Sequence, residues 1–277
     1  MSGFGEEELE RYRRHIILRE VGGPGQAKLK GASVLVIGAG GLGSPLLLYL
    51  AAAGVGRIGV VDDDVVDLSN LQRQVLHETS RIGQPKTGSA RQALTALNPH
   101  VRIEEHKTRI AAKNALDMIA RYDIVADGCD NFATRYLVSD ACYFARKPLV
   151  SAAVGQFTGQ LSVFKPYLKD DTGTPLPGYR DLLPSPPAPE AAPSCAEAGI
   201  IGALPGVMGS LQAMEVIKEI LGLRTSLAGW LLLYDALETE FMKIKLAWSP
   251  DNPLTGKAPT ITDLSIHEGQ ETGACRG

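Results

Sequence analysis

The sequence predicts an α/β fold: a Rossmann-like, doubly wound and mostly parallel sheet with helices on both faces, followed by C-terminal antiparallel strands and a long crossover loop. A glycine-rich turn joins an apolar strand to an apolar helix within residues 33–62, and a second strand completes that unit. Strand-like and helix-like segments then alternate as far as residue 165. This alternation is typical of parallel sheets whose crossover helices cover both faces.

The remaining elements follow from local patterns. Residues 6–20 carry apolar side chains at helical spacing between charges and predict an amphipathic N-terminal helix. A helix within 84–100 is expected to end at Asn98-Pro99, because proline stops a helix. Further strands are expected at 101–110, 122–131, 148–154 and 159–165, and further helices at 114–122 and 132–147.

The C-terminal part is less regular. Residues 165–203 are rich in Pro and Gly and predict the long loop, after which a helix at 206–222 and strands at 229–237 and 239–248 are expected. From Ser249 onward the composition predicts weak structure. No linker divides the chain sharply, so we expect a single domain over residues 1–277. Its nucleotide-binding half covers about 30–150, a second half 151–247 and a tail 248–277.

The composition excludes several classes of protein. Of the 277 residues, 44% are hydrophobic and 21% charged, which is ordinary for a soluble globular protein. The net charge of -3, without any run of like charges, argues against direct binding to nucleic acid or to a membrane surface. The N-terminus has no secretory apolar stretch, no apolar run is long enough to span a bilayer, and the four cysteines are far apart. We therefore expect a cytoplasmic protein, with Cys129 and Cys142 as buried apolar side chains.

The glycine-rich turn predicts a nucleotide site. Gly38, Gly40 and Gly43 fit the GxGxxG pattern between a strand and a helix, with Gly41 inside it. Glycines at these positions let phosphate oxygens approach the amides at the start of the helix. Asp62 ends the next strand, 19 residues after Gly43, where a carboxylate is expected to accept hydrogen bonds from ribose hydroxyls.

Three further residues favour a triphosphate over a dinucleotide. Arg73 and Lys86 supply positive charge soon after Asp62, and Asp130 follows a strand in "DGCDN", at the sheet edge where α/β proteins bind ligands. A carboxylate there suits Mg²⁺, which prefers carboxylate and phosphate oxygens. We find no clear acid or base for hydride transfer, so NAD-dependent oxidoreduction ranks last. Taken singly, the two cations could be solvated helix charges and Asp130-Asn131 could only cap a helix. Asp64 could be either a charge of the loop or a neighbour of the metal.

Five stretches together carry a resemblance to a known family. They are "RYRRHIIL", the run from "GAGGLGSP" to "SNLQRQVLH", "GQPK", "DGCDN" and "PSCAEAGIIGALPGVMGSLQAMEVIK". Over roughly residues 5–247 the chain resembles the MoeB/ThiF adenylyltransferases, the bacterial relatives of ubiquitin-activating enzymes. The resemblance implies that ATP and Mg²⁺ activate the C-terminal Gly-Gly carboxylate of a ubiquitin-fold sulfur carrier protein as an acyl-adenylate. Sulfur then replaces AMP, for molybdopterin, thiamin or thiolated-tRNA synthesis.

The resemblance also implies residue roles. Gly41 would face the phosphates and Asp62 the ribose, while Asp130 would hold Mg²⁺ with Asn131 beside it. The phosphates would be gripped by Asn70, Arg73 and Lys86, and Ser69 of the same "SNLQRQ" motif and Asp64 are assigned to the same nucleotide site. Arg14 in "RYRRHIIL" would reach the partner subunit's triphosphate in a homodimer. Cys195 in "PSCAEAG" would lie where the family often has a cysteine used in sulfur or thioester chemistry.

The chain departs from the family in one respect. Many members have two CxxC zinc-binding pairs, whereas Gly178 and Asp181 stand at the first location and the tail has no cysteine pair. We therefore expect no zinc, with the loop and tail less firmly held. The chain also ends without a rhodanese-like domain, so a separate sulfur donor protein is expected.

Two other functions stay open. One is activation of a non-protein carboxylate, as in the tRNA-modifying dehydratases of the same superfamily. The other is a non-catalytic nucleotide-binding partner subunit, which the intact set of Arg73, Lys86 and Asp130 disfavours.

Overall fold

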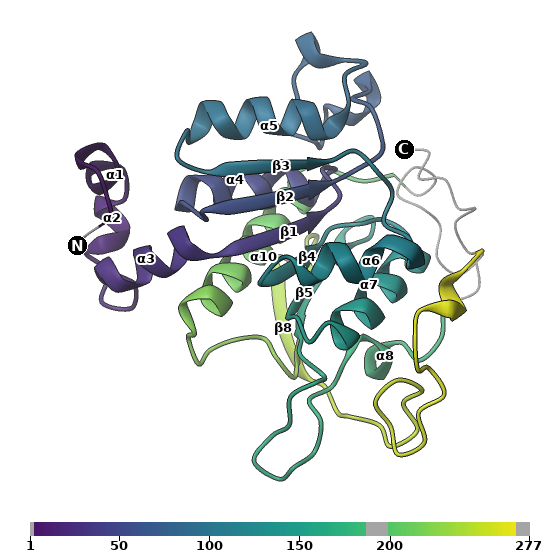
Figure 1. Ribbon diagram of the computed structural model, residues 1–277. Helices are drawn as coiled ribbons and strands as arrows, with labels where there is room; N and C mark the ends of the chain where they lie inside the picture. The colour runs from purple at the N-terminus through teal and green to yellow at the C-terminus, as the bar shows by residue number, and fades with distance from the viewer. Residues whose placement is uncertain (1–2, 187–198, 270–277) are drawn as a thin grey trace.

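Eight strands form one twisted sheet in the order β3-β2-β1-β4-β5-β6-β7-β8 (Figure 1). The computed structural model describes residues 3–186 and 199–269. The first five strands run parallel and the last three are antiparallel, which confirms the predicted fold class. Their bounds are β1 (Ser33–Ile37), β2 (Arg57–Val61), β3 (Arg102–His106), β4 (Ile124–Asp127), β5 (Leu149–Val154), β6 (Thr158–Phe164), β7 (Trp230–Asp235) and β8 (Glu240–Lys245).

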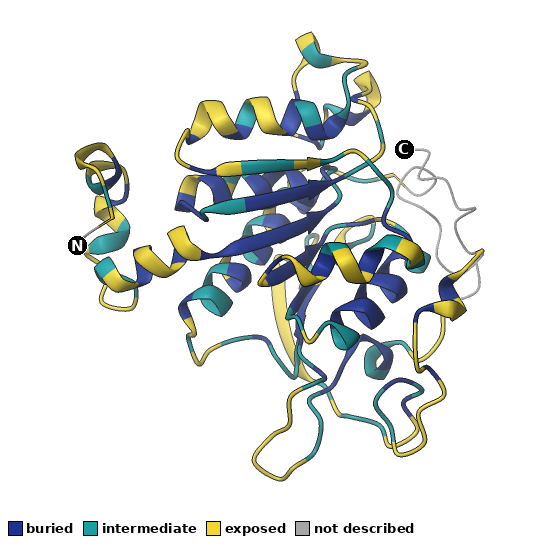
Figure 2. Ribbon diagram, in the orientation of Figure 1, coloured by how far each residue is buried: buried dark blue, intermediate teal, exposed yellow. Residues whose placement is uncertain are grey.

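Helices cover both faces of the sheet. One apolar core lies beneath α4 (Gly43–Ala53), α5 (Lys86–Leu97) and α10 (Ala203–Leu221). The other lies beneath α6 (Ala112–Ala120), α7 (Phe132–Phe144) and the short α8 (Tyr179–Leu182). Side chains of β1 alternate between the two cores, because successive residues of a strand point to opposite faces. Figure 2 shows β1 buried throughout and the outer sides of α5 and α6 exposed.

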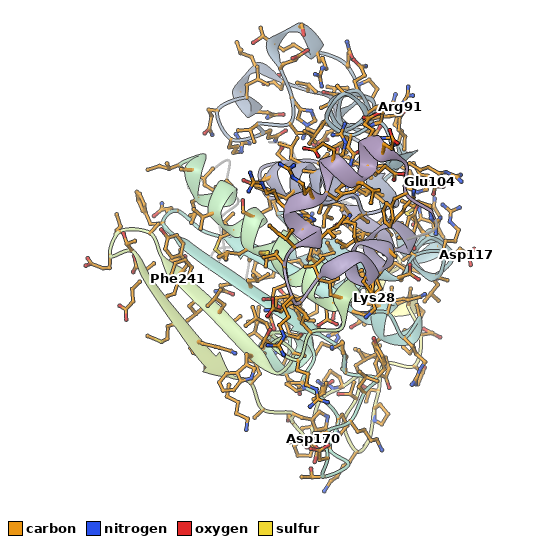
Figure 3. The ribbon with its side chains drawn as sticks, turned by 90° about the vertical axis from the view of Figure 1, so that its left-hand side faces the viewer. Lys28, Arg91, Glu104, Asp117, Asp170 and Phe241 are labelled. Atoms are coloured by element: carbon orange, nitrogen blue, oxygen red, sulfur yellow. The ribbon has the colours of Figure 1, made fainter. Side chains whose placement is uncertain are left out.

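The far edge of the sheet is different. All six residues of β8 are exposed, and Figure 3 shows Phe241 at this edge, away from the helices. None of the helices in the described ranges is long and apolar enough to cross a membrane.

The N-terminal prediction was wrong in detail. Instead of one helix over residues 6–20 the structure has α1 (Glu6–Arg11) and α2 (Arg13–Ile16), which meet at Tyr12. Tyr12 leaves the helical conformation (φ -97°, ψ 9°) and is buried, and its hydroxyl accepts a hydrogen bond from Asn98 Nδ2 at 2.8 Å. A further helix, α3 (Gly22–Gly31), follows in a Gly-rich stretch that we did not assign to a helix. Leu29, buried in the core, stabilises α3 through packing.

The described parts of the loop and the tail contain short helices and buried side chains. Within residues 165–186 the chain forms α8, and the tail contains a short 3₁₀ helix, η4 (Ser265–His267). The tail side chains of Leu254, Ile261 and Leu264 are buried. Polar contacts, which composition does not reveal, join the tail to α7 and α8. That the loop and the tail are less firmly held than in zinc-binding family members stays a prediction.

Candidate active site

A cavity of about 860 Å³ opens at the carboxyl ends of β1, β2 and β4 and extends over β5, β6 and β7. This volume is near the upper end for small-ligand sites. The predicted residues that line the cavity are Gly38, Gly40, Gly41, Asp62, Asp64, Arg73, Lys86, Asp130 and Asn131.

The glycine turn forms one end of the cavity. Gly38 has a positive φ of 91°, which favours glycine. A Cβ on Gly43 would lie 2.0 Å from the Gly38 carbonyl oxygen, so this position must be glycine for α4 to start so close to β1. His77 Nε2 lies 2.9 Å from the Ala39 carbonyl oxygen and its Nδ1 lies 2.8 Å from Ser89 Oγ. Burial lowers the pKa of His77, so the neutral ring holds the turn.

Asp62 joins the turn to the segment after β2. Its Oδ2 accepts a hydrogen bond from the Ala39 amide at 2.8 Å, and its Oδ1 accepts one from the Asp64 amide at 2.9 Å. Burial raises the pKa of the Asp62 carboxyl, while Lys86 and the two amides act in the opposite direction. These contacts orient the carboxylate in the cavity wall.

Lys86 lines the cavity and is held in place by Asp64. The Lys86 amide donates to the Asp64 carbonyl oxygen at 2.9 Å, and its Nζ lies 2.9 Å from Asp64 Oδ2. The Lys86 side chain is 6% exposed, so it is a buried charge held by a carboxylate. An anion bound in this cavity would therefore meet a lysine that is already positioned.

The "SNLQRQ" motif contributes one of its predicted residues directly. Arg73 lies beside the glycine turn, and its Nη1 donates to the Ser69 carbonyl oxygen at 3.0 Å. Ser69 is exposed and Asn70 is fully buried, and neither lines the cavity. The carbonyl oxygen of Asn70 accepts hydrogen bonds from the Arg73 and Gln74 amides, so Asn70 shapes the turn that presents Arg73. Direct contact of Ser69 and Asn70 with a nucleotide stays a prediction.

Asp130 and one group of three carboxylates fit a magnesium ion. Asp130 is exposed at the cavity wall, just after β4. Carboxylate oxygens of Asp62, Asp63 and Asp64 lie within 4.8 Å of one another, the one such group found among the described residues. Carboxylates next to a phosphate site suit Mg²⁺, so the residues present fit this ion. Asn131 has a local role as well, because its Oδ1 accepts a hydrogen bond from the Thr134 amide and caps α7.

The structure adds a buried ion pair that we did not predict. Arg135 of α7 lies in the cavity wall, with its Nη1 3.5 Å from Asp127 Oδ2. Arg135 also donates to the carbonyl oxygens of Ala152, at 2.8 Å, and of Cys129. The Cys129 amide in turn donates to Asp127 Oδ1 at 2.9 Å. Both the amide and the carbonyl of the residue before Asp130 are thus held by this pair.

Other sequence predictions have separate outcomes. Arg14 is exposed and outside the cavity lining. Cys195 lies outside the described residues. Cys129 and Cys142 are buried, as predicted, and burial raises the pKa of both thiols well above the usual range. Neither thiol is therefore suited to act as a nucleophile.

Comparison with known proteins identifies the family. The model of the ThiF family matches residues 12–254. The chain belongs to the ThiF family. This result confirms the resemblance that the motifs predicted.

Several relatives match this ThiF-family chain over nearly all of its length. The sulfur carrier protein adenylyltransferase of Thermus thermophilus is 53% identical, over 95% of this chain and 96% of that protein. The probable adenylyltransferase/sulfurtransferase MoeZ of Mycobacterium tuberculosis is 50% identical, over 96% of this chain and 66% of that protein. For the adenylyltransferase and sulfurtransferase MOCS3 of Bos taurus the identity is 49%, over 96% of this chain and 57% of that protein.

Solved structures support the fold. E. coli MccB with ATP has a TM-score of 0.74 at 23% identity, covering 91% of this chain and 76% of that one. PaaA has a TM-score of 0.72 at 20% identity, covering 89% of this chain and 76% of that one. At these identities the likeness concerns the fold alone.

Proposed function

We propose that the protein is an ATP-dependent adenylyltransferase that activates the C-terminal Gly-Gly carboxylate of a ubiquitin-fold sulfur carrier protein for sulfur transfer. The observation that carries the proposal is the meeting of Arg73, Lys86 and Asp130 around one glycine turn, in one cavity. The 53% identity with the sulfur carrier protein adenylyltransferase of Thermus thermophilus supports the substrate class.

The reaction requires two anions to meet. The carrier carboxylate oxygen forms a bond to the α-phosphorus, the bond from that phosphorus to the bridging oxygen breaks, and pyrophosphate leaves with the electron pair. Lys86 and Arg73 would neutralise phosphate charge as it shifts toward pyrophosphate. Asp62, held by two amides, would accept hydrogen bonds from the ribose hydroxyls. This would fix the adenosine so that the carboxylate attacks the α-phosphorus in line with the bond that breaks. Mg²⁺, held by Asp130 near the Asp62–Asp64 carboxylates, would add further neutralising charge.

The test is ATP–pyrophosphate exchange with purified ubiquitin-fold carriers that end in Gly-Gly. We expect exchange that depends on the carrier and on Mg²⁺, and an increase in carrier mass equal to an adenylyl group. A carrier without its last glycine is the matched control. Absence of exchange with every carrier tried would count against the proposal.

We further propose that the site is completed in a homodimer by Arg14 of the other subunit. Arg14 is exposed on α2, outside the cavity of its own chain. Arg14→Ala and Lys86→Met proteins should each be inactive, while their equimolar mixture should recover roughly a quarter of the wild-type activity, because half the random dimers contain one intact site. If the mixture stays inactive although mixed dimers form, Arg14 does not act in trans.

We also propose that the fold needs no zinc. Asp181, one of the two residues where family members have cysteines, accepts hydrogen bonds from the Gly178 and Ser249 amides, each at 2.8 Å. This carboxylate links the two segments that zinc would link. Elemental analysis of the purified protein should find far less than one zinc per chain, and a stoichiometric zinc content would contradict the proposal. A separate sulfur donor stays a prediction.

A further inference from the structure

Helix α8 forms the cavity wall on the side of β5 to β7. Tyr179, Leu182 and Leu183 line the cavity. A helix of four residues is not stable by itself. Its position must therefore come from contacts with the rest of the protein.

Aromatic packing holds the inner side of α8. The Tyr179 ring meets Tyr136 of α7 edge to face at 5.1 Å, and Phe164 of β6 at 5.8 Å, measured between ring centroids. The Tyr136 hydroxyl donates to the Leu183 carbonyl oxygen at 2.8 Å. These contacts join the wall to the sheet and to α7.

Of the next two residues of α8, Arg180 binds α7 and Asp181 binds the C-terminal tail. Arg180 donates from Nε and Nη2 to the two carboxylate oxygens of Asp140, at 2.9 and 2.7 Å. His267 Nε2 lies 2.9 Å from Asp140 Oδ2, and Asp181 accepts from the Ser249 amide at 2.8 Å. Asp140 is fully buried, while Arg180 and His267 are 7% and 5% exposed. Breaking a buried ion pair is strongly destabilising, so these contacts fix the position of α8 relative to α7 and the tail. We call the five residues the tail clamp: Asp140, Arg180, Asp181, Ser249 and His267.

The position of α8 in the cavity indicates which ligand it serves. Asp62, which would accept hydrogen bonds from the ribose, follows β2, and the glycine turn follows β1, so adenosine would lie over β2 and β1 and the phosphates near β4. The wall at α8 is on the opposite side, over β5 to β7. This side of the cavity is therefore the part left for the carboxylate that would attack the phosphate.

We propose that the tail clamp positions α8 and thereby shapes the part of the cavity that receives the acceptor's C-terminal segment. Asp140 and His267 are positioning residues, since they act through Arg180 and neither lines the cavity. The tail thus becomes a component of the acceptor site, although none of its described residues, 248–269, lines the cavity. The identity of the acceptor rests on the proposed function. The coupling between the tail and α8 rests on the contacts described above alone.

The coupling is tested by hydrogen–deuterium exchange without any ligand. The Asp181 and Leu183 amides donate within the α8 turn, at 3.1 and 2.9 Å, so their exchange reports its opening. His267→Ala should speed exchange of residues 178–183 about tenfold, as expected for loss of a hydrogen bond to a carboxylate, and leave residues 38–44 unchanged. His267→Gln, which can still donate to Asp140, should restore slow exchange. Glu268→Ala, at an exposed neighbouring position, is the control.

The role in acceptor binding is tested by pyrophosphate exchange with a Gly-Gly-ended carrier. His267→Ala and, independently, Asp181→Ala should raise the KM for the carrier about tenfold and leave the KM for ATP within about twofold. Equal rises in both KM values, or unchanged exchange of residues 178–183 in His267→Ala, would overturn the proposal. If wild-type protein fails to activate any carrier, the proposed function fails, while the deuterium experiment still decides whether the clamp holds the wall.

Discussion

Replacing Arg135 with methionine would test how strongly the buried ion pair holds the turn that carries Asp130. Methionine retains much of the side-chain length but removes the charge and all donors. Arg135 is 8% exposed and Asp127 is fully buried, so the substitution leaves a buried carboxylate without its cation. The carboxylate keeps hydrogen bonds from the Cys129 amide at 2.9 Å and from Ser151 Oγ at 3.1 Å.

The expected loss is large because of that remaining charge. Removing one partner of a buried pair lowers the free energy of unfolding by about 3–5 kcal/mol. Asp127→Asn removes the other charge, so the double variant should be more stable than the sum of the single losses predicts, by about 1–3 kcal/mol. Arg91→Met is the control, since Arg91 pairs with Glu105 at the surface and is 57% exposed, and it should change stability by less than about 1 kcal/mol.

Urea unfolding followed by circular dichroism measures the wild-type protein and the four variants under the same conditions. If the losses from Arg135→Met and Asp127→Asn add within about 0.5 kcal/mol, the two residues do not act as a pair and the account of the turn is wrong. A loss for Arg135→Met no greater than that for Arg91→Met would have the same consequence. Deuterium exchange of residues 128–131 should also rise in Arg135→Met, since Arg135 binds the Cys129 carbonyl.

Three more predictions concern the glycine turn and its neighbours. Gly40→Ala should keep wild-type stability, because the nearest atom would lie 3.7 Å from the new Cβ, but calorimetry should show weaker ATP binding. Gly43→Ala should lower the unfolding midpoint itself, because its Cβ would lie 2.0 Å from a carbonyl oxygen. Equal midpoints for the two variants would contradict this account. Burial lowers the pKa of His77 below its ordinary 6.5, so as the pH falls the imidazole of the unfolded chain takes up a proton before that of the folded protein. The free energy of unfolding should therefore decrease as the pH drops below 6.5 toward the folded pKa, by up to about 1.4 kcal/mol per pH unit. His77→Gln should flatten that pH dependence, and an unchanged slope between pH 6.5 and 5 would show that His77 is not responsible. Lys86→Met should weaken ATP binding about tenfold or more, whereas Lys107→Met, at an exposed position, should leave it unchanged. Equal ATP affinities of the two variants would show that Lys86 does not bind the nucleotide.

Sequence alone predicted those residues of the cavity wall that directly follow a strand. The glycine turn, Asp62 and Asp130 each follow a strand that could be read from its apolar residues, and parallel strands bring their carboxyl ends to one edge. The roles of Arg135 and the tail clamp depend on contacts across long stretches of chain. His267 and Asp140 are 127 residues apart, and neither lies in a pattern that local chemistry would single out.

The N-terminal helices show the same limit for secondary structure. Helical spacing over residues 6–20 is real, but it does not show that burial of Tyr12 against Asn98 interrupts the helix. Conversely, we assigned no helix to the Gly-rich residues 22–31, while Leu29 in the core stabilises a helix there. In both places a tertiary contact outweighs local propensity, whose differences are below about 1 kcal/mol per residue for most residues.

Lys86 illustrates why residues distant in sequence can still be assigned to one site. Lys86 follows Asp64 by 22 residues, with two 3₁₀ turns between them, and nothing in that interval predicts a fixed distance. The distance is set because Asp64 binds Lys86 twice, through the main chain and through the side chain. Asp62 binds the Asp64 amide with one carboxylate oxygen and the Ala39 amide of the glycine turn with the other. A continuous series of hydrogen bonds therefore runs from the turn to the lysine, so the group that would accept the ribose and the cation that would meet the phosphates are positioned together.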